Sequence, residues 1–239
     1  MCDNHQFHFS RRGLLVAGAA VTALGGMMAS PVAAQQAAPA TPPNAISPDA
    51  ALQRLMEGNA RYVENAPSNK DFSAGRAARA TAQYPFAAIL SCADSRVAPE
   101  LAFDQGPGEL FVVRVAGNFV HDDGLASLEY GALVLGIPLI MVLGHSNCGA
   151  VDAAIKVMTD NAQLPGHLPE LVNSIKPAVE IAKKAKPANL LDASIAENVR
   201  YNVTRLIEAK PIVAEAVAAG KVKVVGAVYD LATGKVTPV

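Results

Sequence analysis

The sequence has no excess of charge of either sign. Its 239 residues include 20 Lys and Arg against 21 Asp and Glu, which gives a formal net charge of −1. Only 17% of the residues are charged. Nucleic acids and anionic membrane surfaces are held mainly by strong basic fields, and this chain has none. We therefore expect neither as a partner.

Cysteine is scarce. The three cysteines, Cys2, Cys92 and Cys148, are too few for the disulfide scaffold on which small secreted proteins with thin cores depend. With 51% hydrophobic residues, the chain is long and apolar enough to form a well-buried core instead.

The chain also lacks a strongly apolar run of the roughly 20 residues that a membrane span needs. Residues 13–29 carry no charge, but many of them are Ala or Gly. Such a short and mild stretch favours the hydrophobic part of an export signal, with an uncleaved N-terminal anchor as the alternative. Arg11 and Arg12 directly before it resemble a twin-arginine signal, and Val32-Ala33-Ala34 offers a cleavage site. We predict a signal peptide over 1–34, export to the periplasm or beyond, and no stable membrane association after cleavage.

Residues 35–46 are rich in Ala, Pro, Gln and Thr without periodicity, which predicts a flexible linker. Ser47-Pro48-Asp49 then has the order of an N-cap, a first-turn proline and a first-turn acid, and predicts a helix start. No later change in composition marks a boundary, so we expect a single domain over 47–239.

Short apolar runs alternate with helical patterns along this domain. The runs at 86–91, 110–115, 139–143 and 222–228 are nearly uncharged, as in strands that are covered on both faces. Helical patterns follow Asp122 and cover 150–158, 168–184 and 191–219, and a turn at 232–234 predicts a terminal hairpin. The pattern predicts an α/β fold: a mostly parallel central sheet flanked by helices, with an N-terminal helix and a C-terminal edge strand.

Two polar clusters directly follow two of the predicted strands, where α/β sheets gather ligand chemistry. The first is Cys92-Ala93-Asp94-Ser95-Arg96 and the second is His145-Ser146-Asn147-Cys148-Gly149. Two thiolates and an imidazole suit zinc, and three protein ligands would leave a fourth position open. Two small buried thiols, or a disulfide, are the alternatives.

Asp94 and Arg96 suggest a further role beside such a metal. The carboxylate of Asp94 can accept a hydrogen bond from metal-bound water, and Arg96 can hold that carboxylate in a bidentate pair. Gly149, which has no side chain, would permit a close approach of the backbone beside the metal.

Cys-x-Asp-Ser-Arg followed by Gly-His-x-x-Cys-Gly resembles the β-class carbonic anhydrase family over nearly the whole predicted domain. The resemblance implies one Zn²⁺ per subunit, bound by Cys92, His145 and Cys148, and the same pairing of Asp94 with Arg96. It also suggests that Asp94, freed from Arg96, could turn onto the metal and close the fourth position. It implies a lyase in which zinc-bound hydroxide attacks carbon dioxide to give bicarbonate and a proton.

The resemblance also implies a substrate pocket. Gln83, Phe111 and Tyr130 match the positions that line the carbon dioxide pocket in one style of site in this family. The other style uses a Trp in a non-catalytic bicarbonate site, and this chain has no Trp. Family pockets lie between subunits, so we expect a homodimer or a dimer of dimers.

Two other functions remain open at this point. One is hydrolysis of carbon disulfide or carbonyl sulfide on the same scaffold, and the other is a non-catalytic zinc-binding protein.

Overall fold

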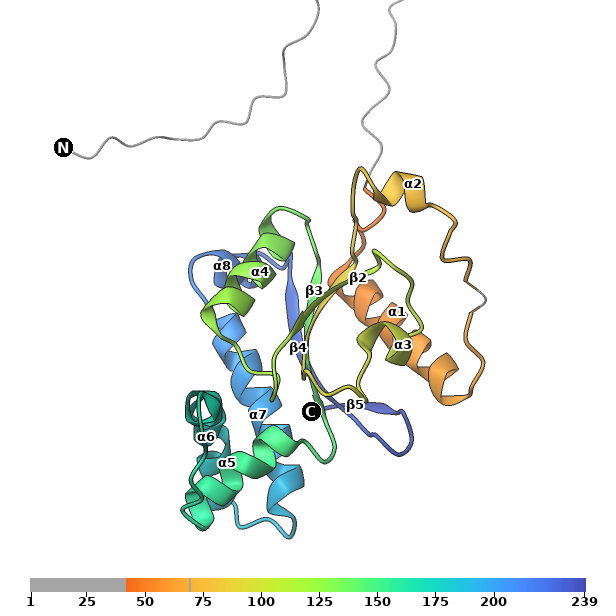
Figure 1. Ribbon diagram of the computed structural model, residues 1–239. Coiled ribbons are helices and arrows are strands. Elements are labelled where there is room, and N and C mark those ends of the chain that lie inside the picture. The colour runs from red at the N-terminus through yellow and green to blue at the C-terminus, as the bar shows by residue number, and fades with distance from the viewer. Residues whose placement is uncertain (1–41, 69) are drawn as a thin grey trace, which may run out of the picture. The chain divides into compact units, whose positions relative to one another are not determined.

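A computed structural model describes residues 42–68 and 70–239 (Figure 1). Five strands in this part of the chain form one sheet in the order β2-β1-β3-β4-β5. The first four strands in that order run parallel, and β5 pairs antiparallel with β4. The bounds are Ala87–Ser91 for β1, Leu110–Arg114 for β2, Leu139–His145 for β3, Lys223–Tyr229 for β4 and Val236–Pro238 for β5. The predicted strands, the terminal hairpin and the mostly parallel sheet are confirmed.

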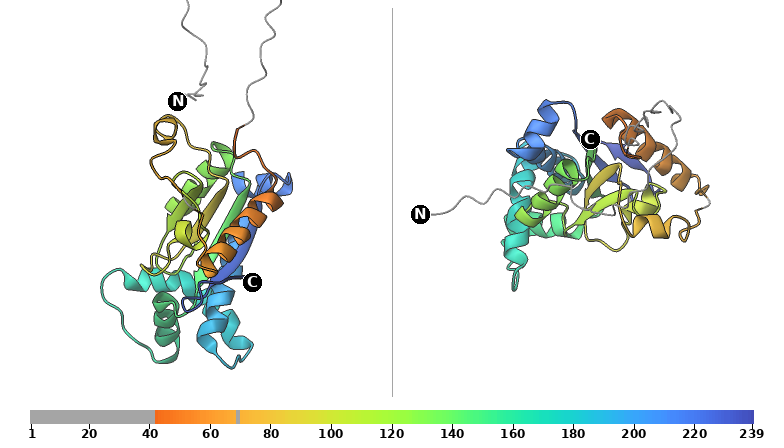
Figure 2. Two further views of the ribbon diagram at one scale, coloured as in Figure 1. Left: turned by 90° about the vertical axis from the view of Figure 1, so that its right-hand side faces the viewer. Right: turned by 90° about the horizontal axis from the view of Figure 1, so that it is seen from above.

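Helices cover both faces of the sheet, as the uncharged strands require. On one face lie α1 (Pro48–Val63) and the short α3 (Pro99–Ala102), and on the other lie α4 (Asp122–Leu133), α7 (Leu190–Ile207) and α8 (Ile212–Ala218). The two further views show the same layers (Figure 2). The strands alternate between two cores: Ile89 and Met141 face α1, whereas Leu90 and Val142 face α4 and α7.

Three further helices complete the described chain. The short α2 (Arg76–Arg79) lies in the long segment between α1 and β1. Beyond the carboxyl ends of the strands, α5 (Gly149–Thr159) and α6 (Leu168–Lys184) pack against α7 around a third core cluster. The helical pattern over 191–219 forms two helices, and Pro211, which has no N–H to continue a helical ladder, lies between them.

Side chains cap both predicted helix starts. The hydroxyl of Ser47 accepts a hydrogen bond from the N–H of Ala50 at 3.1 Å, and Pro48 is the first residue of α1. At α4, His121 takes the N-cap position, and its Nδ1 accepts from the N–H of Gly124 at 3.3 Å.

The end of the predicted linker differs from the expectation. Asn44 is 3% exposed, and its side-chain amide donates to the carbonyls of Pro85 at 3.1 Å and Leu135 at 2.8 Å. These contacts anchor the chain to the domain several residues before α1. The prediction of a flexible linker over 35–46 is therefore wrong for its last residues. The signal predicted over 1–34 and the linker residues 35–41 lie outside the described residues. No described helix is long and apolar enough to cross a membrane.

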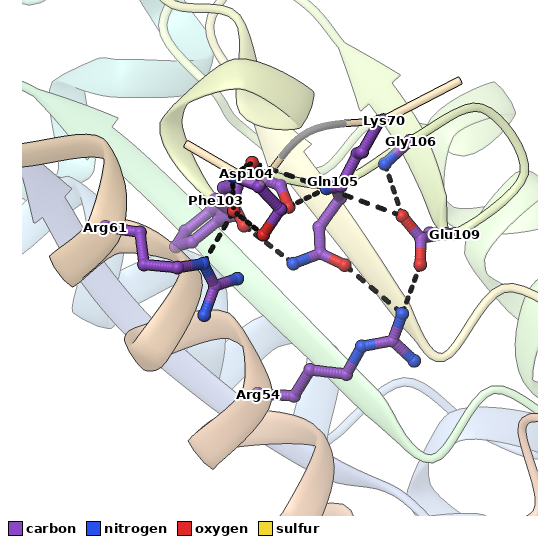
Figure 3. A network of polar contacts seen from close by, with 9 residues as sticks. Arg54, Arg61, Lys70, Phe103, Asp104, Gln105, Gly106 and Glu109 are labelled. Atoms are coloured by element: carbon purple, nitrogen blue, oxygen red, sulfur yellow. Dashed lines mark hydrogen bonds and ion pairs between the residues drawn. The ribbon is translucent and has the colours of Figure 1, made fainter. Parts of the chain in front are cut away.

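A polar network ties α1 to the segment that leads into β2 (Figure 3). Arg61 and Ser68 donate to the carboxylate of Asp104 at 2.6 and 2.7 Å, and Lys70 lies 3.4 Å from the same carboxylate. Arg54 pairs with Glu109 and lies over the ring of Phe86, 3.9 Å from its centroid. Burial opposes ionisation of Asp104, but the hydrogen bonds from Arg61 and Ser68 outweigh it and lower the pKa of Asp104 to about 2.

We predict that Asp104→Asn destabilises the fold in a pH-dependent way. The pKa of Asp104 is depressed in the folded state, so its ionised form stabilises the fold fully above about pH 4, and that stabilisation is lost as the pH falls through about 2. At pH 7 the variant should lose about 2 kcal/mol of unfolding free energy, since it loses charge-assisted hydrogen bonds to a buried group. Denaturant titrations at pH 7 and pH 2.5 measure the difference.

The matched control is Asp49→Asn, because Asp49 forms an exposed pair with Lys223 on the surface. It should change the unfolding free energy by less than about 1 kcal/mol. A loss in Asp104→Asn that is the same at both pH values would contradict the role given to its charge.

Candidate metal centre

The two predicted clusters meet because β1 and β3 are neighbours and run parallel. Ser91, the last residue of β1, pairs with Leu143 of β3, so the chain leaves both strands at the same edge of the sheet. Cys92 follows β1 directly, His145 ends β3, and Cys148 caps α5 three residues later. Their ligand atoms lie within 4.8 Å of one another, and the three residues are at most 4% exposed. Both thiols are free, so the disulfide alternative is wrong for this structure.

The imidazole of His145 is oriented by the backbone. Its Nδ1 lies 2.9 Å from the carbonyl oxygen of Ser146, which can only accept, so Nδ1 carries the proton. The other nitrogen, Nε2, is buried and has no hydrogen-bond partner among the described residues. A buried ring nitrogen with a free lone pair beside two thiols is costly unless a cation binds there. This donor set fits zinc.

The two neighbouring thiols shift each other's pKa in opposite directions. A hydrogen bond from Cys148 favours the thiolate of Cys92. This effect outweighs the opposing effect of burial and lowers the pKa of Cys92 to about 4. The same hydrogen bond, together with burial, raises the pKa of Cys148. The N–H groups of Val151 and Ala150 at the start of α5 favour the Cys148 thiolate, though more weakly. A divalent cation would stabilise both thiolates and so displace the proton of Cys148.

Asp94 and Arg96 form the expected bidentate pair. Arg96 donates from Nε to Oδ1 at 2.9 Å and from Nη2 to Oδ2 at 2.7 Å, and its backbone N–H also donates to Oδ1 at 2.9 Å. These hydrogen bonds hold the pKa of Asp94 well below its ordinary value, so it is ionised at neutral pH. Its Oδ2 lies 3.8 Å from Nε2 of His145, which places the carboxylate beside the three ligands.

Sequence reasoning missed the role of Arg114, the last residue of β2. Its side chain donates to the carbonyls of Cys92 at 2.9 Å, Asp94 at 2.7 Å and Val97 at 2.9 Å. Arg114 therefore fixes the segment that carries both a thiol and the carboxylate. The sequence signal that could have indicated this role is Arg114 itself, a single charged residue at the end of an otherwise uncharged strand.

The residues expected to line the pocket do not gather around the ligands within one chain. Gln83 is exposed and precedes β1, at the opposite end of that strand from Cys92. Phe111 pairs with Ala88 near the start of β1, and Tyr130 is 48% exposed on α4. Gly149 begins α5 beside Cys148, and a Cβ there would meet no atom within 4 Å. Within this chain there is therefore space for a larger side chain at position 149.

The sequence and the fold are both similar to known proteins. The model of the family described as "Carbonic anhydrase" matches residues 87–236. The carbonic anhydrase of Mycolicibacterium smegmatis is 39% identical over 191 residues, which cover 80% of this chain and 92% of that protein. The solved structure of the Coccomyxa β-carbonic anhydrase in complex with acetazolamide is 30% identical, with a TM-score of 0.62 over 79% of this chain and 86% of that one. A tetrameric β-carbonic anhydrase of Sordaria macrospora, 23% identical, has the same fold with a TM-score of 0.63, over 69% of this chain and 86% of that one.

Proposed function

This chain belongs to the carbonic anhydrase family, and we propose that it catalyses the reversible hydration of carbon dioxide to bicarbonate and a proton. The family match and the relative at 39% identity support this activity over hydrolysis of carbon disulfide or carbonyl sulfide, and over a non-catalytic zinc protein. The observation that carries the proposal is the buried Nε2 of His145, which has no hydrogen-bond partner in the part of the chain that the structure describes and lies beside the thiols of Cys92 and Cys148.

Cys92, His145 and Cys148 would hold one zinc ion per chain. Zinc bound there would lower the pKa of a coordinated water and so make hydroxide available near neutral pH. With three protein ligands, the fourth tetrahedral position stays free for that chemistry.

Asp94 orients the nucleophile. An ionised carboxylate can only accept hydrogen bonds, so a hydroxyl beside Asp94 must point its hydrogen toward it and its lone pair elsewhere. Arg96 occupies both carboxylate oxygens and keeps Asp94 at 3.8 Å from the His145 nitrogen. The pair thus aims the hydroxyl and prevents Asp94 from becoming a fourth ligand itself.

We predict that Arg96→Ala retains zinc but loses most of its hydration activity, by about 100-fold or more, since the aim of the nucleophile is lost. Zinc content by atomic absorption and stopped-flow hydration of carbon dioxide measure the two properties separately. Arg200→Ala, which removes an exposed arginine paired with Glu197 on α7, is the control and should keep both. Full activity in Arg96→Ala would refute the role of the pair.

The pocket is completed by a second subunit in this proposal. Gln83 precedes β1 and Cys92 follows it, and the strand between them is about 17 Å long, so the Gln83 side chain cannot reach the metal centre of its own chain. Phe111 and Tyr130 would supply an apolar wall for carbon dioxide, and the amide of Gln83 would donate to the bicarbonate that forms. The Sordaria macrospora relative is tetrameric, which is consistent with a dimer or a dimer of dimers here.

Mixing two inactive variants tests this arrangement. Gln83→Ala keeps the metal ligands, whereas Cys148→Ser loses a ligand and should lose zinc. In a mixed dimer, the intact metal centre of the Gln83→Ala chain meets the intact Gln83 of the Cys148→Ser chain. Random pairing makes half of the dimers mixed, and each mixed dimer has one working site of two. We therefore expect refolded mixtures to regain up to about one quarter of the wild-type activity.

The control mixes Arg96→Ala with Cys148→Ser. Arg96, Asp94 and the three ligands all come from one chain. Each centre in a mixed dimer therefore lacks either Arg96 or Cys148, and no activity should return. Equal inactivity of both mixtures would contradict a pocket shared between subunits.

We further propose that the protein is exported by a twin-arginine signal over 1–34. The support is Arg11-Arg12 followed by the uncharged residues 13–29. Export after folding would also protect the thiolates, because bound zinc keeps Cys92 and Cys148 from oxidising. We expect a chain with Arg11→Lys and Arg12→Lys to stay in the cytoplasm on cell fractionation, and one with Arg76→Lys and Arg79→Lys to be exported normally. Export of the first chain would refute this signal.

A further inference from the structure

Helix α7 carries two buried asparagines one turn apart. Asn198 is 1% exposed and Asn202 is fully buried, although α7 packs against the sheet mainly through apolar residues such as Val199 and Leu206. A buried amide is costly unless it is hydrogen-bonded, and two of them on the core face of a helix would be replaced by Leu or Val at a gain unless their contacts mattered. Their partners therefore indicate their role.

Both asparagines hold the segment that follows β2. The Nδ2 of Asn198 donates to the carbonyl of Gly117 at 2.8 Å, and the Oδ1 of Asn202 accepts from the N–H of Val120 at 2.8 Å. Asn202 also donates to the carbonyl of Asn198 at 2.8 Å and to its Oδ1 at 3.2 Å, so the first amide is itself fixed by the second. The pair thus connects α7 to a loop about 80 residues earlier in the chain.

The same loop touches the metal centre. The N–H of Gly117 donates to Sγ of Cys92 at 3.3 Å. Gly117 has φ +85°, a conformation that favours glycine, and a Cβ on it would lie 2.5 Å from Cδ1 of Ile175. Any other residue would be strained at this position, and the carbonyl of the same glycine is the group that Asn198 holds.

We propose that Asn198, supported by Asn202, is a positioning residue for the metal centre. It fixes Gly117 so that the Gly117 N–H donates to the sulfur of Cys92 and keeps that sulfur aimed at His145 and Cys148. The inference rests on the metal role of Cys92 given in the proposed function. Hydrogen bonds to ligating atoms orient the ligands and tune their basicity, and their loss typically weakens metal binding by 10- to 100-fold.

The test compares metal binding, not activity, in Asn198→Ala and in a matched variant, Asn59→Ala. Asn59 is a buried asparagine on α1 that donates to the carbonyls of Ala102 and Gly234 at 2.9 and 2.8 Å, on the other face of the sheet. Both substitutions remove a buried amide that joins a helix to a loop, so a merely structural role should affect the two alike.

Zinc affinity is measured in the full chain by competition with a chromogenic chelator, and the thiolate-to-metal charge-transfer band is recorded after loading Co²⁺. We expect about 10- to 100-fold weaker zinc binding and a shifted band in Asn198→Ala, and changes of less than about 2-fold with an unshifted band in Asn59→Ala. Equal affinity and an identical band in Asn198→Ala and the wild type would overturn the proposal. So would equal losses in the two variants.

Asn202→Ala decides the question if Asn198→Ala does not fold. It leaves the contact between Asn198 and Gly117 but removes its support, so zinc binding weaker than in Asn59→Ala upholds the proposal, and unchanged binding overturns it. Failure of the wild-type chain to bind one zinc would instead refute the metal centre of the proposed function, which distinguishes the two inferences.

Discussion

The parallel pairing of β1 with β3 is the constraint on which the site depends. Cys92 and His145 are far apart in the sequence, and they meet only because Ser91 pairs with Leu143 and both strands end at one edge of the sheet. A shift of one residue in this register would turn alternate side chains to the opposite face. The two apolar cores, with Ile89 and Met141 on one side and Leu90 and Val142 on the other, therefore hold the metal ligands in place as well as the fold.

Around this edge, the backbone is held by side chains from elements that carry no ligand. Arg114 of β2 holds the segment from Cys92 to Val97 through three carbonyls, and Asn198 of α7 holds Gly117. Each contact satisfies a backbone group that a sharp turn at a strand end leaves without a ladder partner. The ligands are thus positioned by the sheet and by the helix that covers it. Such supporting contacts keep the ligand atoms in a fixed geometry, as a metal centre requires.

The metal ligands and the substrate pocket that we propose obey different physical demands. Thiolates and imidazole must be close, buried and dry, which one chain provides at the end of two strands. Gln83 and Tyr130 instead lie exposed at other parts of the surface, and an exposed aromatic beside an edge strand suits contact with another subunit. An uncharged substrate is not attracted by the electric field of a protein, so a net charge close to zero does not hinder its binding.

The sequence by itself determined the order of the strands and of the longer helices, the three candidate ligands and the pairing of Asp94 with Arg96, but not the short helices α2 and α3. These follow from local patterns: uncharged runs for covered strands, caps such as Ser47, and a spacing of two residues that lets Arg96 reach Asp94. Only the tertiary structure decided which nitrogen of His145 faces the thiols, that Asn44 anchors the end of the predicted linker, and that Gln83 lies away from the metal centre of its own chain. The anchoring of Asn44 depends on contacts between residues distant in sequence, whereas the His145 ring is oriented by the neighbouring Ser146 carbonyl and Gln83 is separated from Cys92 by the length of β1. Asn44 finds its partners 41 and 91 positions away, and Asn198 finds Gly117 81 positions away. No local pattern in the sequence specifies such pairings, because strand order and register are set by packing of the whole chain.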